Sequence, residues 1–114
     1  MTTLAEQIYR RLLRRARDRR PGLTYAALAA SLCPPVHPRS PALHRALGEV
    51  SHACRHAKLA CLPALVARAD THRPSTGYYR VAHPRAATDE ARISAWEREH
   101  ARVFRELARY PPRI

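Results

Sequence analysis

An apolar stripe along residues 41–58 restricts this segment to an amphipathic helix. The stripe has spacings of four, three, four and three residues and consists of Leu43, Leu47, Val50, Cys54 and Ala57. Residues at these spacings lie on one side of a helix. Ser40 and Pro41 mark its start, because a serine side chain can accept a hydrogen bond from a free helical amide and proline is tolerated at the first helical position. The sequence therefore predicts a helix over 41–58 with an apolar inner side.

The opposite side of this helix is polar and mostly basic. It consists of Arg45, Gly48, Glu49, His52, Arg55 and His56, flanked by His44, Ser51 and Lys58. A shorter helix over 25–32, capped by Thr24, precedes it, and a proline-rich turn at 33–39 joins the two. Two capped helices joined by a turn, the second with a basic outer side, are typical of a helix-turn-helix. An ordinary helical hairpin with solvated charges has the same spacing, so both interpretations stand.

The N-terminal segment predicts another helix, from Leu4 to Asp18 or Arg19. Thr3 and Glu6 form a capping box, and the helix should stop before Pro21-Gly22. Seven arginines crowd its second half: Arg10, Arg11, Arg14, Arg15, Arg17, Arg19 and Arg20. They exceed what favourable interaction with the helix dipole requires, which indicates contact with phosphates, the alternative being a solvated helix end.

Two strands and a long helix are expected after residue 58. Residues 64–69 and 78–82 favour strands, and the turn-rich loop 70–77 between them predicts a hairpin, the wing of a winged helix. Thr88 then caps a last helix that runs to Tyr110. Its stripe consists of Ile93, Trp96, His100, Val103, Leu107 and Tyr110, with Phe104 beside it. Such a stripe either closes the core or forms a dimer seam.

The net charge of +12 is unevenly distributed. Residues 1–88 contain 15 basic and four acidic residues, whereas 89–114 contain six arginines and five acids. A strongly basic body indicates a polyanionic partner. No run of 18 apolar residues is present, the N-terminus lacks the apolar core of a signal peptide, and the three cysteines are an odd number. We therefore expect a reduced, cytoplasmic protein without a membrane span.

Histidines and cysteines raise the question of a metal. Cys33 and His37 are four residues apart, and His52, Cys54 and His56 alternate ahead of Cys61. This spacing is a poor match to the close pairs of a zinc site, and on a helix Cys54 points away from the two histidines. We expect no metal and no cofactor. The nine acids form no evident acid–base pair, so we also expect no enzyme activity.

Residues 23–79 resemble the DNA-binding part of the alkylguanine-DNA alkyltransferases and alkyltransferase-like proteins. The matching pieces are Leu23-Thr24-Tyr25, Leu28-Ala29, Arg45-Ala46-Leu47, Leu62-Pro63, Leu65-Val66 and Gly77-Tyr78. The resemblance implies a helix that enters the minor groove, with Arg45 as the arginine that replaces an extruded base. The family's Pro-Cys-His-Arg motif would start at Pro63, but Ala64-Leu65-Val66 follows here. The methyl-accepting cysteine and the asparagine hinge are absent, so the resemblance implies the fold and not the transfer reaction.

Together these patterns predict a single α+β, mostly helical domain over 1–114. It would be a winged helix-turn-helix with three helices, a β-hairpin wing at 64–82 and a long C-terminal helix. We expect a small bacterial or phage transcription regulator that binds duplex DNA and dimerises through 89–110. The groove would be contacted by Arg45, His52, Arg55 and His56, and phosphates by Arg14, Arg15, Arg17, Arg20 and Arg73. The alternative is a small interaction protein, such as a phage-type inhibitor of host defence, which grips an acidic protein or a ribonucleoprotein.

Overall fold

Hydroxyl side chains cap the start of four helices in the computed structural model, which describes residues 2–20 and 22–113. These helices are α1 (Leu4–Arg17, capped by Thr3), α2 (Tyr25–Ser31, Thr24), α3 (Pro41–His56, Ser40) and α5 (Asp89–Arg105, Thr88). In each, the hydroxyl oxygen accepts a hydrogen bond from the backbone N–H three residues later. The sequence predicted all four starts correctly. Pro21, which we expected to end the first helix, lies outside the described residues.

The remaining elements are short. They are β1 (Leu23–Thr24), the 3-10 helix η1 (Leu62–Leu65), β2 (Val66–Ala67), α4 (Thr76–Ala82) and the 3-10 helix η2 (Leu107–Arg109). Over residues 2–20 and 22–113 the chain thus forms five α-helices and two strands, a mostly helical α+β fold. No helix in these ranges is long and apolar enough to cross a membrane.

The predicted β-hairpin at 64–82 is wrong. Val66 and Ala67 do form a strand, but it pairs in parallel with Leu23 and Thr24 rather than with residues 78–82. The second predicted strand is helical and forms α4. The described part of the chain therefore contains a parallel pair and a short helix where a wing was expected.

Packing against α3 explains why residues 76–82 form a helix despite their tyrosines. Tyr78 and Tyr79 are both buried, and their rings meet edge to face with centroids 5.2 Å apart. The Tyr78 hydroxyl is 3.0 Å from His83 Nε2, just beyond the end of α4. At the other end of α4, the Ser75 N–H donates to the Tyr25 hydroxyl at 2.9 Å. Strand propensity reflects the surface against which a side chain packs, so these tertiary contacts override it.

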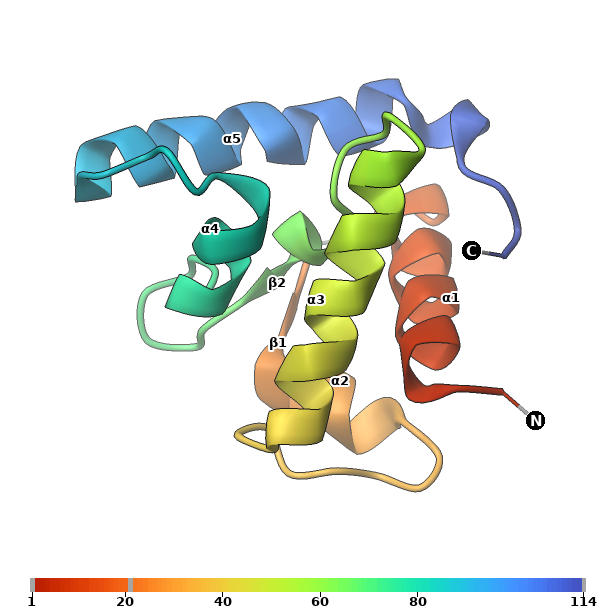
Figure 1. The fold of residues 1–114 in the computed structure, drawn as a ribbon. Coiled ribbons are helices and arrows are strands. Elements are labelled where there is room, and N and C mark those ends of the chain that lie inside the picture. The colour runs from red at the N-terminus through yellow and green to blue at the C-terminus, as the bar shows by residue number, and fades with distance from the viewer. Residues whose placement is uncertain (1, 21, 114) are drawn as a thin grey trace.

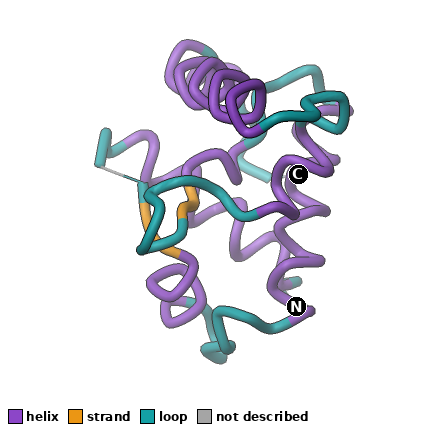
Figure 2. The backbone as a smooth tube through the Cα atoms, turned by 90° about the vertical axis from the view of Figure 1, so that its left-hand side faces the viewer, coloured by secondary structure: helices purple, strands orange, loops and turns teal. Residues whose placement is uncertain are grey.

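The helix α3 lies between α1 on one side and α4 on the other (Figure 1). The strand β1, which leads into α2, pairs with β2, which follows η1, and this pair lies behind α3 in that view. The long helix α5 crosses one end of the molecule, and Figure 2 shows it nearly end-on above the other elements. It packs mainly on η1. This arrangement leaves the side of α3 that faces away from the strands uncovered.

The inner side of α3 matches the predicted stripe except at its last position. Leu43, Val50 and Cys54 are almost fully buried, but Ala57 is exposed. The helix ends at His56, and Lys58 adopts a left-handed backbone conformation with a φ of 60°. The chain therefore turns before another helical residue could reach the core.

The stripe of the last helix packs at least in part within the molecule. Val103 and Tyr110 are buried, and the Trp96 indole N–H donates to the Ala64 carbonyl at 2.9 Å. The predicted helix to Tyr110 instead breaks after Arg105 and resumes as η2. Trp96 and Phe104 keep part of their surface exposed. The dimer remains a prediction.

Candidate nucleic-acid interface

Four exposed side chains form a row along the outer side of α3. Arg45, Glu49, His52 and His56 follow at spacings of four, three and four, which places them on one line along a helix. We call this row the α3 ridge. It lies opposite the buried stripe of the same helix. Three of the four residues predicted to contact the groove, Arg45, His52 and His56, therefore come together.

Arg55, the fourth predicted groove residue, lies beside the ridge. Its guanidinium donates to the backbone carbonyl of Val81 in the last turn of α4. A cation at this point is favourable because the carbonyl end of a helix is partly negative. Arg55 is therefore held towards α4 and turned away from the line of the α3 ridge.

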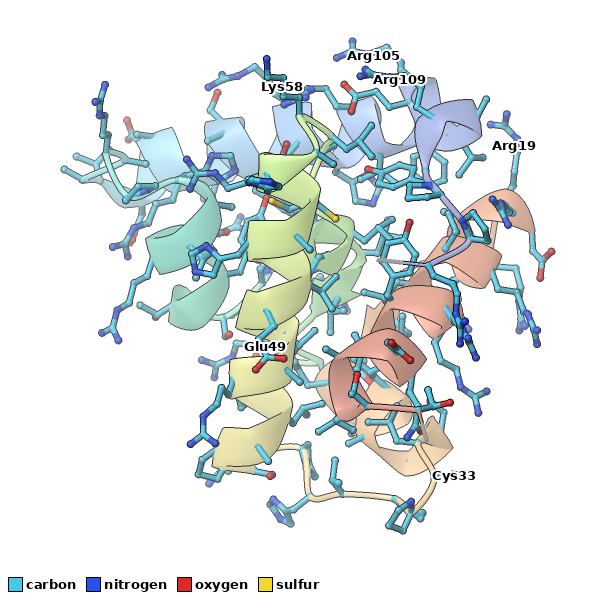
Figure 3. All side chains as sticks on the ribbon, turned by 45° about the vertical axis from the view of Figure 1, so that its right-hand side comes forward. Arg19, Cys33, Glu49, Lys58, Arg105 and Arg109 are labelled. Atoms are coloured by element: carbon cyan, nitrogen blue, oxygen red, sulfur yellow. The ribbon has the colours of Figure 1, made fainter. Side chains whose placement is uncertain are left out.

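Glu49 is the ridge residue that the predicted site omitted. Its carboxylate projects from the middle of α3 (Figure 3). The same spacing that unites Arg45 with His52 also includes Glu49, so the sequence contained the signal. An acid in this row opposes phosphate contact and can accept a hydrogen bond from a base edge such as the cytosine amino group.

The segments on both sides of α3 carry exposed arginines. On the side of α1, Arg14, Arg17 and Arg20 are exposed, as predicted for phosphate contacts, whereas Arg15 is half-buried and interacts with other groups. On the side of α4, Arg73 is exposed in the loop that leads into this helix. Figure 1 shows that α1 and α4 flank α3, so these arginines belong to segments on the two sides of the helix that carries the ridge.

A small hollow opens between α3 and α4. Tyr25, His44, Ser51 and Tyr78 are among its lining residues, and the rings of Tyr25 and His44 lie 5.5 Å apart. Gly48 contributes no side chain, and an added Cβ would lie 4.0 Å from Val81. The hollow combines aromatic faces with hydroxyl groups next to the ridge. Sequence reasoning did not single out this site, because its residues come from separate segments.

The segment that aligns with the alkyltransferase motif lies in the core. Ala64, Leu65 and Val66 are buried, so they present no reactive group to a ligand. The nearby Cys61 thiol is also buried, and burial raises its pKa. Because the thiolate is the nucleophilic form, a raised pKa makes this cysteine a poor nucleophile. Cys54 is similar, since burial raises the pKa of its thiol to about 11.

A buried polar cluster ties α5 to α4. The Glu99 carboxylate accepts a hydrogen bond from Arg102 Nη1 at 3.2 Å and lies 3.8 Å from His83 Nε2. Burial raises the pKa of Glu99 and lowers that of His83, whose pKa is lowered further by neighbouring arginines. A partly desolvated carboxylate next to an arginine is an ordinary structural ion pair.

The described residues contain no group of three or more histidine, cysteine or acidic side chains placed to hold a metal. His52 and His56 share the ridge, whereas Cys54 is buried on the other side of α3. The alternating His-Cys-His pattern of the sequence is therefore divided between surface and core.

Comparisons with protein-family models, with curated proteins and with solved structures find no match for this chain. Its geometry and chemistry must therefore support any functional conclusion.

Proposed function

We propose that this protein binds duplex DNA, with the α3 ridge in a groove and the flanking arginines on the two phosphate backbones. The observation that supports this most strongly is the α3 ridge, an exposed helix face on a helix flanked by two segments that carry exposed arginines, α1 and the loop before α4 with α4 itself. A helix in a groove with cations over the adjoining phosphates is the general geometry of helical DNA-binding proteins.

The two sets of side chains would have different roles. Phosphate contacts supply affinity and do not depend on sequence, whereas contacts to base edges supply discrimination. Arg14, Arg17, Arg20 and Arg73 would supply affinity, and Arg45, Glu49 and His52 discrimination. The buried thiols fit a binding role without alkyl transfer. A small DNA-binding regulator is the corresponding biological role.

A matched pair of acidic residues tests whether the ridge faces DNA. Glu49→Gln should tighten binding to random-sequence duplex, because a negative charge would leave the interface. Glu90→Gln removes an exposed acid from α5 and should change this affinity little. Fluorescence anisotropy at fixed salt measures both. Equal effects of the two variants would place the ridge outside the interface.

The same surface would suit the alternative partner, an acidic protein or ribonucleoprotein. No single contact among residues 2–20 and 22–113 favours this alternative, and the absence of DNA binding by the wild-type protein would leave it standing. We also propose that the half-exposed stripe of α5 forms the homodimer expected from the sequence. Sedimentation at several concentrations tests this, and a single-subunit mass throughout would contradict it.

A further inference from the structure

An open hollow with basic walls lies where α3, α4 and α5 meet. Its volume is about 630 Å³, and its polar lining residues are Arg55, His83, Arg85 and Arg98. Arg55 comes from α3, Arg85 from the loop between α4 and α5, and Arg98 from α5. The other lining residues are alanines and one proline, so the cations project over a small apolar floor. We call this the basic hollow.

None of the described residues that line the basic hollow is acidic. Arg55 donates to a backbone carbonyl and Arg98 to the Ser94 hydroxyl at 2.8 Å, so these neutral acceptors leave both charges uncompensated. Arg85 is exposed, and it forms no ion pair with any other described residue. Glu99 lies behind His83 and forms an ion pair with Arg102. The hollow therefore concentrates positive charge without an internal counter-ion.

The pKa of His83 indicates that two of the hollow's charges, Arg55 and Arg98, lie near the same ring. Arg98, Arg55 and Arg102 each lower the pKa of this half-buried ring, after the larger effect of burial. The other polar groups that face the ring are the Tyr78 hydroxyl on α4, at 3.0 Å from Nε2, and the Glu99 carboxylate on α5, at 3.8 Å. Arg55 on α3 and Arg98 on α5 are like charges that repel one another, and an anion between them would relieve the repulsion.

We propose that the basic hollow is a phosphate-binding site, separate from the α3 ridge. Guanidinium groups match phosphate geometry because each can donate two parallel hydrogen bonds, and three of them more than neutralise a phosphate dianion. The phosphate can belong to a nucleic-acid backbone or to a free phosphate or pyrophosphate ion. The site does not depend on the proposed binding of DNA by the ridge.

The test titrates the 114-residue chain calorimetrically with inorganic phosphate and pyrophosphate. The double variant Arg85→Ala/Arg98→Ala should bind about tenfold more weakly or not measurably, since it lacks two charge-assisted hydrogen-bond donors. Arg39→Ala/Arg80→Ala removes the same charge from exposed positions outside the hollow and should retain binding. The charge-preserving variant Arg85→Lys/Arg98→Lys should retain part of it. All four arginines are exposed, so circular dichroism should show folded variants.

A second arm distinguishes the source of the phosphate. If the ligand is a backbone phosphate, Arg85→Ala/Arg98→Ala should make the slope of log affinity for DNA against log salt less steep. The change should be about 0.9 for each DNA phosphate that the variant no longer neutralises. The lysine variant should keep the wild-type slope. One-to-one binding of free phosphate without that change identifies a free anion as the ligand.

The proposal is overturned if the hollow variant alters neither phosphate binding nor the DNA slope. It is also overturned if Arg39→Ala/Arg80→Ala weakens phosphate binding equally, because the effect would then be one of net charge. Phosphate binding by a protein that does not bind DNA would reject the proposed function and leave the basic hollow standing.

Discussion

Glu49 determines how the α3 ridge can contribute to binding a polyanion. The ridge contains one arginine, one glutamate and two histidines, so with neutral histidines its formal charge cancels. Little of the affinity for DNA can then come from the ridge, and the flanking arginines must supply it. A ridge of this composition suits hydrogen bonding to base edges, for which donors and acceptors are both needed.

Arg45 is the ridge residue whose loss should reduce discrimination most. If its guanidinium contacts a base, Arg45→Ala should cost about 1–3 kcal/mol at one base pair and much less on random DNA. Competition between specific and random duplexes measures the difference. An equal loss on both would show that Arg45 contacts only phosphate.

His100 gives the folded protein a defined pH dependence. The ring lies between Trp96 and Phe104, with centroids 5.9 and 5.5 Å away, and burial lowers its pKa. In the unfolded chain this histidine has the ordinary pKa of about 6.5. As the pH falls below that value, the unfolded state therefore binds more protons than the folded state. The contribution of His100 to stability is therefore complete above this value and lost as the pH falls towards the lowered pKa.

Urea unfolding at several pH values tests the role of His100. The wild-type protein should lose more stability than His100→Leu between about pH 7.5 and pH 5, because the variant has no ring to protonate there. His83 also has a lowered pKa and contributes a loss of the same sign in both proteins, whereas the raised pKa of Glu99 acts in the opposite direction. An equal or larger loss in His100→Leu would contradict this account.

At the scale of elements, local signals predicted α1, α2, α3 and α5 but not α4, which was predicted as a strand, and tertiary contacts decided the rest. The capping hydroxyls and apolar spacings lie within single segments, so the sequence showed them directly. The parallel pairing of β1 with β2 joins segments that are far apart in the chain, Leu23 with Val66 and Thr24 with Ala67, and no local pattern specifies such a partner. The hairpin prediction failed because it assigned the strand at 66–67 to its neighbour in sequence.

Gly22 tests the parallel pair. An alanine Cβ at this position would lie 2.4 Å from the Leu65 carbonyl oxygen, so the backbone next to β1 and β2 would have to shift. Gly22→Ala should lower the free energy of unfolding by about 1–3 kcal/mol, as overpacked sites do.

Gly77 offers the matched control for this prediction. Its nearest neighbour for an added Cβ is the Ser75 hydroxyl at 4.0 Å, and it lies within α4. Gly77→Ala should be neutral or stabilise by about 0.5–1 kcal/mol, because alanine favours helix. Denaturant midpoints measure both variants. Equal stability of the two would show that residues 22 and 65 are not in close contact.

At the scale of the whole molecule, cations gather at the end of α3 that meets α5. Figure 3 shows Lys58, Arg105 and Arg109 together at the end where α3 meets α5, with Arg19 at the end of α1. The sequence predicted the basic side of α3 and the arginines of α1 from spacing and charge alone. It did not predict that Arg55 turns to α4 or that Arg85 and Arg98 share a hollow, because those positions depend on how separate helices pack.

The salt dependence of binding to duplex DNA tests the central claim most directly. If about five to eight phosphates are contacted by the arginines beside the ridge, the slope of log affinity against log salt should lie between about −4 and −7. Anisotropy titrations of the wild-type protein over a salt series measure it. Affinity that falls with this slope would support a DNA-binding protein, and no measurable binding even at low salt would contradict it.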